Sequence, residues 1–305
     1  MNKDEHIVAS AARHILSQIH HVVVGKDETL TWTLAAILAR GHILLEDSPG
    51  VGKTTMALAF SQSLGLHHNR MQFTPDVLPS DVTGYNVPGA DGTMVYRAGS
   101  VLCNLFLADE LNRATSRTQA ALLEAMEEGQ VTVDGTVHKL PSPFIVLATQ
   151  NPTGAAGTQL LPDSQMDRFM VRLSLGYPSP KDEMRMVMNR QNRNPLEEVK
   201  PLLTREQLNI LQDQVAQTYL CDSVVGYIVE LISHTRNHSQ IIQGASPRAT
   251  LAVTAMAKAV ARLRGRDYVV PQDVKEVFAP TVAHRLLLTP KAEGQGVSPE
   301  QILEE

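Results

Sequence analysis

A glycine-rich segment at positions 48–55, SPGVGKTT, has the composition of a phosphate-binding loop. It follows a short apolar run, residues 43–45, that predicts a buried strand, and it opens into a helical pattern. Strand, glycine-rich loop and helix, in that order, are the context that a P-loop requires. Gly50 and Gly52 let the backbone approach an anion because neither carries a Cβ atom. The loop N–H groups and the positive end of the helix can then hold a triphosphate.

Two side chains of this loop are expected to act on the nucleotide. Lys53 would reach the β- and γ-phosphates, and the Thr54 hydroxyl would bind Mg²⁺. The general motif has a glycine at position 47, where this chain carries Asp47, so the match departs there. The alternative is a glycine-rich turn with an incidental lysine. We expect the whole loop to bind nucleotide: Asp47, Ser48, Pro49, Gly50, Val51, Gly52, Lys53, Thr54 and Thr55.

Two further apolar runs end in polar side chains. Residues 105–108 lead into Asp109 and Glu110, which is a Walker B arrangement. Asp109 would bind Mg²⁺ and Glu110 would polarise an attacking water, whereas the alternative is a solvated acidic turn. Residues 144–149 lead to Asn151, whose amide we expect to point at the γ-phosphate or the water. The alternative for Asn151 is an ordinary turn residue.

An arginine near the start of a predicted helix is a further candidate. Ser246 is a suitable N-cap and Pro247 suits the first helical position, so Arg248 falls in the first turn. A cation there is opposed by the helix dipole, which argues against a role in local stability. We infer that Arg248 reaches an anion. The alternative is a surface arginine without a partner.

The elements that must position these residues divide the chain into two predicted domains. The turn-forming segment GYPSP at 176–180 separates an α/β pattern from a nearly all-helical one. We expect a P-loop α/β domain over residues 1–178, in which helices flank a parallel sheet. A small all-α lid would follow over 179–289, and a loose tail over 290–305.

Composition narrows the class of protein. The chain has 305 residues, of which 43% are hydrophobic and 19% charged, as in ordinary globular proteins. Its net charge of −5 shows no basic footprint for nucleic acid. Cys103 and Cys221 alone cannot form a disulfide framework. The N-terminus lacks the apolar core of a signal peptide, and no apolar run approaches the ~20 residues that span a bilayer, so we expect a cytoplasmic protein without a membrane span.

Several motifs occur together in one order: PGVGKTT, LFLADELNRA, TQAALLEAMEEGQVTVDG, VLATQNP, MDRF, GYP and GASPRA. From about Val24 to Leu288 the chain closely resembles the MoxR family of AAA+ ATPases. The resemblance implies an ATP-hydrolysing ring, usually a homo-hexamer, with ATP held between subunits. It also implies chaperone-like remodelling or activation of partner proteins, often beside a protein with a von Willebrand factor A domain. The client protein is not identified by the sequence.

The resemblance assigns roles to individual residues. Lys53 and Thr54 resemble Walker A, and Asp109 and Glu110 resemble Walker B. Asn151 resembles sensor 1, Arg168 an arginine finger that reaches a neighbour's ATP, and Arg248 sensor 2. Arg113 and Arg117 are alternatives for the finger. Val24 and Gly25 resemble the segment near the adenine base, and Asp47 is ordinary in this family's version of the loop.

Other segments also match the family, with one departure. Residues 84–99 resemble the helix-2 insert and residues 131–140 the pre-sensor-1 hairpin, loops that move against a substrate in related motors. The segment 153–158 lacks an acidic residue that the family pattern leads us to expect. Glu127 and Glu128 are interpreted as solvated helix charges.

Two alternative functions share this fold. One is a metal-insertion motor subunit like that of magnesium chelatase, which differs mainly in its partners. The other is a nucleic-acid motor, for which a basic insert or hairpin would be needed. Because neither 84–99 nor 131–140 is strongly basic, the sequence argues against nucleic acid.

Overall fold

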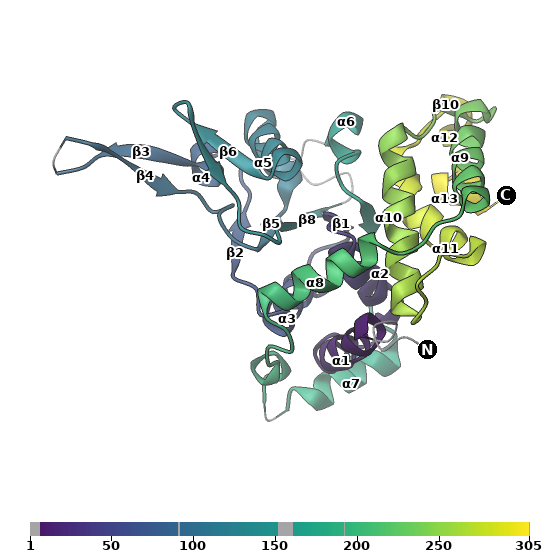
Figure 1. Cartoon of the computed structure of the whole chain (residues 1–305), viewed down its shortest axis with the longest axis horizontal. Helices are drawn as coiled ribbons and strands as arrows, with labels where there is room; N and C mark the ends of the chain where they lie inside the picture. Colours follow the sequence, from purple (N-terminus) through teal and green to yellow (C-terminus); the bar gives the residue numbers. More distant parts are fainter. Residues whose placement is uncertain (1–6, 91, 152–160, 192, 305) are drawn as a thin grey trace.

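The computed structural model describes residues 7–90, 92–151, 161–191 and 193–304. The segment 153–158, where the sequence departs from the family pattern, lies outside these residues. Figure 1 shows an α/β body, a long arm that projects from it, and a mostly helical part at the opposite side. Among the described residues no helix is both long and apolar enough to cross a bilayer.

The α/β body contains five parallel strands in the order β2-β5-β8-β1-β9. All five carboxyl ends therefore lie at one edge, where Glu46 is in register with Gln150 and Gln72 with Asp109. The sequence predicts the two edge strands over residues 71–73 and 171–175, whereas β2 begins at His68 and β9 ends at Leu173. The strands are β1 (Ile43–Glu46), β2 (His68–Gln72), β5 (Leu105–Asp109), β8 (Ile145–Gln150) and β9 (Val171–Leu173).

Helices cover both faces of the sheet because successive strand side chains point to opposite sides. Ile43 and Leu45 belong to one apolar cluster, and Leu44 belongs to the other. The first cluster includes residues of α1 (Ile7–Val22), α2 (Asp27–Leu38) and α3 (Lys53–Ser63), and the second includes residues of α5 (Ser116–Glu128).

The sequence pattern predicts one helix over residues 113–128, but helix α5 begins three residues later, at Ser116. Leu111–Arg113 form a separate 3-10 turn, η2, and the Thr115 side chain then caps α5 by accepting from the Thr118 amide. A capped start is stable because it satisfies an amide that has no partner within the helix. The prediction of one helix from Arg113 is therefore wrong at its first turn.

Two hairpins form the arm and its base. The arm follows α4 (Pro79–Thr83) and consists of β3 (Gly84–Pro88) and β4 (Met94–Ala98). The second hairpin is β6 (Gln130–Val133) and β7 (Thr136–Lys139), and both residues of its Asp134–Gly135 turn have positive φ, as a type I′ turn requires.

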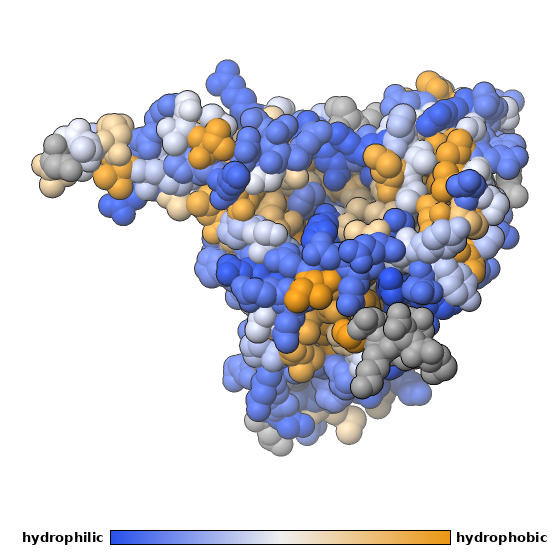
Figure 2. Space-filling view, viewed as in Figure 1, coloured by the Kyte–Doolittle hydropathy of each residue, from blue (hydrophilic) through white to orange (hydrophobic). Residues whose placement is uncertain are grey.

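The two hairpins touch each other through side chains. The Tyr96 and His138 rings stack with centroids 3.6 Å apart, and Asn86 Nδ2 donates to Asp134 Oδ2 at 2.8 Å. Figure 2 shows hydrophobic residues along the otherwise polar arm. In β4 the side chains of Met94 and Val95 are exposed. The arm is thus joined to the second hairpin and presents apolar side chains to its surroundings.

The helical part begins after β9. Helix α8 starts with a capping box, in which the side chains of Thr204 and Gln207 each accept from the other residue's main-chain amide. The lid, which the sequence predicts to be all-helical, also contains two short strands: β10 (Ile241–Gln243) and β11 (Leu287–Leu288) form an antiparallel pair. Its helices are α7 (Pro180–Asn189), α8 (Arg205–Ala216), α9 (Asp222–Asn237), α10 (Pro247–Leu263) and α11 (Pro271–Val282), with 3-10 turns η3 (Pro195–Glu198) and η4 (Ala283–Arg285).

The C-terminal residues are ordered against this part. They form α12 (Pro290–Gly294) and α13 (Pro299–Glu304), and Ile302 packs with Leu288 in a small apolar cluster. Glu300 also accepts from Arg172 of β9 at 2.7 Å. The sequence also predicts a short helix from Ser298, with which α13 agrees. The prediction that the tail is loose is wrong, because Ala292 and Ile302 are buried against β10 and β11.

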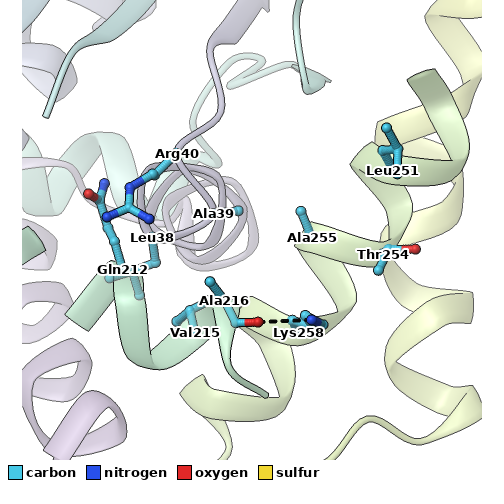
Figure 3. Close-up of a pocket in the computed structure, with 10 residues that line it drawn as sticks. All are labelled: Leu38, Ala39, Arg40, Gln212, Val215, Ala216, Leu251, Thr254, Ala255 and Lys258. Carbon is cyan, nitrogen blue, oxygen red and sulfur yellow. Dashed lines mark hydrogen bonds between the residues drawn. The ribbon is translucent and has the colours of Figure 1, made fainter. Parts of the chain in front are cut away.

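The helical part meets the α/β body where α10 packs against α2 and α8 (Figure 3). Gln212 of α8 donates to the Ile37 carbonyl at 2.8 Å, and Lys258 of α10 donates to the Ala216 carbonyl at 2.9 Å. A groove of about 200 Å³ lies at this junction, lined also by the exposed Leu251. The groove contains none of the residues that the sequence predicts to bind nucleotide.

Candidate nucleotide site

The glycine-rich loop connects β1 to α3 at the carboxyl edge of the sheet. Gly50 has φ +86° and Gly52 has φ +100°, a backbone conformation that strains any residue with a Cβ atom. A Cβ at either position would meet no other atom, so the requirement for glycine is conformational. Because Gly52 precedes the first turn of α3, the unpaired amides of that turn face the loop. This geometry suits an anion.

Lys53 is almost buried beneath the loop. Its Nζ donates to the Asp47 carbonyl at 2.7 Å and lies 3.4 Å from the Ser48 carbonyl and from Asn151 Oδ1. Burial lowers the pKa of the ammonium, an effect that the carboxylates of Asp47, Asp109 and Glu110 oppose. The cation is thus held at the edge where the loop, β5 and β8 end.

Asp47 has a different environment from the one that the sequence suggested. Its carboxylate accepts from Ser174 Oγ at 2.7 Å, Leu175 N at 2.6 Å and Gly176 N at 3.0 Å. A buried carboxylate needs such donors to offset the loss of water. The side chain therefore ties the loop to the segment that leaves β9, and only the Asp47 carbonyl, which accepts from Lys53, belongs to the anion site.

Asp109 ends β5 and has two partners that the sequence reasoning missed. Its Oδ1 accepts from Thr149 Oγ1 at 2.7 Å, and its Oδ2 accepts from Arg70 Nη2, also at 2.7 Å. Thr149 is the penultimate residue of β8, and Arg70 is on the edge strand β2. The strand order could not be read from local patterns, so these cross-strand partners could not be found from the sequence.

Glu110 lies in the left-handed region at φ 55°, ψ 47°. Such a conformation costs a non-glycine residue roughly 1–3 kcal/mol and is found preferentially at functional sites. The Glu110 amide donates to Thr149 Oγ1 at 2.8 Å, while its carboxylate accepts from Arg113 Nη1 at 2.9 Å and from Asn151 Nδ2 at 3.2 Å. Asn151 therefore lies between Lys53 and Glu110 and contacts both.

A cavity of about 260 Å³ adjoins the loop. Val24, Val51 and Thr55 line it from the α/β body, and Tyr177 and Met186 line it from the helical part. Its apolar walls beside an anion site suit a nucleotide base. Gly25 follows Val24 with φ +71°, and a Cβ there would collide with the Asp182 carboxylate. The wall contributed by residues 177–190 was not predicted, because it depends on where α7 packs.

Two of the predicted residues, Arg168 and Arg248, lie at the other edge of the sheet. Arg168 is close to the start of β9, where the Met170 amide donates to the His42 carbonyl at 2.8 Å. Both arginines contact Glu127 in the last turn of α5, at 3.1 Å and 2.5 Å. A strand of about five residues separates the edges by roughly 15 Å. The structure therefore does not bring these arginines to the loop of the same chain.

The two alternative finger residues differ in their surroundings. Arg113 pairs with Glu110 of its own chain. Arg117 is exposed on α5 and makes no ion pair within the described part of the chain. Only Arg113 of these two is thus engaged at the chain's own site.

Comparisons with known proteins agree with the fold. Residues 42–171 match the ATPase family associated with various cellular activities (AAA), and residues 233–305 match the AAA lid domain. The protein YeaC of Bacillus subtilis is 45% identical over 292 residues, which are 95% of this chain and 91% of YeaC. Chaperone MoxR1 of Mycobacterium tuberculosis is 38% identical, over 94% of this chain and 78% of MoxR1.

A crystal structure of a Cytophaga hutchinsonii protein assigned as an ATPase superposes with a TM-score of 0.91 at 35% identity, covering 99% of this chain and 94% of that one. A five-stranded parallel sheet with this loop, followed by a helical lid, defines an AAA+ ATPase. The chain belongs to the MoxR family of these enzymes. The predicted fold class and the predicted ATP-hydrolysing activity are confirmed.

Proposed function

We propose that the chain hydrolyses MgATP at the carboxyl edge of its sheet and that it does so as a ring, of which a homo-hexamer is the expected form. The observation that carries the proposal is the convergence of the loop, Asp109, Glu110 and Asn151 at that edge, with Arg168 and Arg248 a strand length away. Lys53 and the loop amides would bind the phosphates. Glu110 would orient the attacking water. The Asn151 amide, which donates to Glu110, would also contact the γ-phosphate and so link the two.

The residues present also suit a magnesium ion. Mg²⁺ prefers oxygen ligands, and Thr54 at the start of α3 together with Asp109 at the end of β5 supplies a hydroxyl and a carboxylate at the same edge. When bound, Mg²⁺ neutralises charge on the phosphates. Arg70 must share Asp109 with the ion, because it donates to one of its two oxygens in this structure.

The proposal that the chain acts as a ring rests on the positions of Arg168 and Arg248. Since neither reaches its own loop, we infer that Arg168 and Arg248 complete the site of a neighbouring copy. An arginine supplied in trans accelerates phosphoryl transfer by about 10³–10⁵ in other P-loop enzymes. Each copy would then offer its loop edge to one neighbour and its arginine edge to the next.

The test is the rate of Mg²⁺-dependent ATP hydrolysis as a function of protein concentration. We expect the rate per subunit to rise with concentration. Lys53→Ala should lose nucleotide binding, whereas Arg168→Ala should bind ATP normally and turn it over roughly 10³-fold more slowly. Arg13→Ala, which changes an exposed arginine of α1 that forms no ion pair within the described part of the chain, is the control. A rate per subunit independent of concentration, or a fully active Arg168→Ala, contradicts the trans arrangement.

We further propose that hydrolysis drives chaperone-like remodelling of a partner protein in the cytoplasm, beside a protein with a von Willebrand factor A domain. Family membership and the apolar side chains of the arm support this. The described residues of β3, β4, β6 and β7 include only two lysines or arginines, Arg97 and Lys139, so a nucleic-acid clamp is not favoured. Salt-sensitive binding of duplex DNA would overturn this preference. A metal-insertion role shares the site and is distinguished by its partner.

A further inference from the structure

Glu127 connects the two distant arginines. Its Oε1 accepts from Arg248 Nη2 at 2.5 Å, and its Oε2 forms an ion pair with Arg168 Nε at 3.1 Å. The second contact is ionic and not a hydrogen bond, because the Nε–H is not directed at the oxygen. Glu127 is 40% exposed, as a solvated charge would be, and its two ion pairs are a feature that the sequence did not indicate. One carboxylate bridges arginines that come from different domains and lie 80 residues apart in the chain.

The main chain beneath these arginines is fixed by other contacts. Asp167 accepts from Arg285 Nε at 2.7 Å and from Ser246 Oγ at 3.0 Å. The nearly buried Arg285 also donates to the carbonyls of Asp167 and Phe169. The segment that carries Arg168 is thus attached to the start of α10, which carries Arg248. The contacts that fix these backbone positions do not involve Glu127. Glu127 contacts both guanidinium groups, and Asp167 Oδ2 also lies 4.0 Å from Arg248 Nη1.

Both helix ends at this cluster carry the charge that the helix dipole disfavours. Glu127 is in the last turn of α5, whose end is negative, and Arg248 is in the first turn of α10, whose end is positive. Arg168 and Arg248 would also repel each other without an anion between them. The positions of Glu127 and Arg248 are electrostatically unfavourable with respect to the two helix dipoles, so local helix stability does not explain them. The attraction between the carboxylate and the guanidinium groups offsets part of this electrostatic cost.

The contact with Arg168 also leaves part of that side chain available. Glu127 approaches its Nε, and within the described part of the chain no hydrogen bond or ion pair engages Arg168 Nη1 or Nη2. Paired N–H groups of a guanidinium fit two oxygens of a phosphate. Glu127 therefore holds the side of the guanidinium and leaves its outer N–H pair for a second anion.

We propose that Glu127 is a positioning residue that presets Arg168 and Arg248 as a pair for the γ-phosphate bound by a neighbouring copy. The inference rests on the proposed trans arrangement. Glu127→Gln should leave ATP affinity at its own loop unchanged and lower turnover roughly 10- to 100-fold, as misplacement of a catalytic group by about 1 Å does. Glu128→Gln is the matched control, because Glu128 is exposed on the same helix and forms no ion pair within the described residues; it should retain full turnover.

Mixed rings separate the inference from the proposed function on which it rests. Glu110→Gln chains bind ATP without turnover yet keep their arginines, so they should restore activity to Arg168→Ala/Arg248→Ala chains. They should likewise raise the turnover of Glu127→Gln chains. The double variant Glu110→Gln/Glu127→Gln should fail as a donor of arginines.

The outcomes are distinct. If Glu110→Gln does not restore the Arg168→Ala/Arg248→Ala chains, the trans arrangement itself is refuted. If it restores them, but the double variant restores them equally well, the trans arrangement stands and the role of Glu127 is refuted. A Glu127→Gln chain with full turnover, or with weakened ATP binding at its own loop, also overturns the inference.

Discussion

Asp47 illustrates how one side chain can serve a functional loop without facing its ligand. Most P-loops have glycine at this position. Here the carboxylate is buried and accepts three hydrogen bonds from residues 174–176. The loop is thereby attached to the segment that connects the two domains. The departure from the general motif reflects a structural contact and not a weakened anion site.

This contact predicts the effect of Asp47→Asn. The amide cannot accept all three bonds and adds donors that have no acceptor, so the variant should lose about 1–3 kcal/mol in free energy of unfolding and bind nucleotide more weakly. Urea unfolding and nucleotide titration measure the two effects. Asp213→Asn, which removes an exposed ion pair with Arg40, should cost less than about 1 kcal/mol. Equal stability of both variants would contradict the structural role.

Among the elements, the C-terminal helices were least visible in the sequence. Helix α13 has six residues, too few to be stable alone in water. It forms because Ile302 is buried, with 7% of its surface exposed, in a cluster that includes Ile241 and Leu288 of the two antiparallel strands. A pattern that depends on such partners cannot be recognised locally, whereas the longer α10 could be predicted from its cap and its periodicity.

Ile302→Ala tests whether these helices belong to the lid. Removal of a buried isoleucine side chain should lower the free energy of unfolding by about 2–4 kcal/mol, since it leaves a cavity. Ile242→Ala makes the same chemical change at a side chain that is 59% exposed and should have little effect. Thermal or urea unfolding compares them. A tail that does not contribute to the lid would make the two variants alike.

For the whole molecule, two buried histidines make the free energy of unfolding depend on pH. Burial lowers the pKa of His42 to about 4, and it lowers the pKa of His284 as well. The folded chain holds both rings neutral, so their stabilising effect is complete above the unfolded pKa of about 6.5 and is lost as the pH falls toward 4. His42 alone would account for about 3 kcal/mol over this window.

The prediction is tested by unfolding at pH 7 and pH 5. Carboxyl groups also titrate in a neighbouring pH range and change the stability of every variant. The informative quantity is therefore the difference between variants in the free energy of unfolding lost from pH 7 to pH 5. His42→Gln should reduce the loss of stability between the two pH values, whereas His14→Gln, at an exposed position, should leave that loss unchanged. If His42→Gln keeps the full pH dependence, the ring is not the group responsible.

The sequence revealed the parts of the site that lie next to one another in the chain. The loop, the pair Asp109–Glu110 and Asn151 each follow an apolar run, and parallel strands bring their ends together. It did not reveal Arg70, Asp167, Arg285 or the role of Glu127. Those residues act through partners up to 121 positions away, and their pairing depends on strand order and on how the lid packs.

The ion pair between Arg70 and Asp109 has a mechanical consequence. Strand β2 is an edge strand held by a single neighbour, β5, and after α4 the chain leaves it for the arm. Arg70 adds a side-chain ion pair between this edge strand and Asp109. An event that draws Asp109 away from Arg70 removes this contact and leaves the main-chain pairing of β2 with β5. The carboxylate that is proposed to bind Mg²⁺ thus also contributes to holding the strand from which the chain leads, through α4, to the arm.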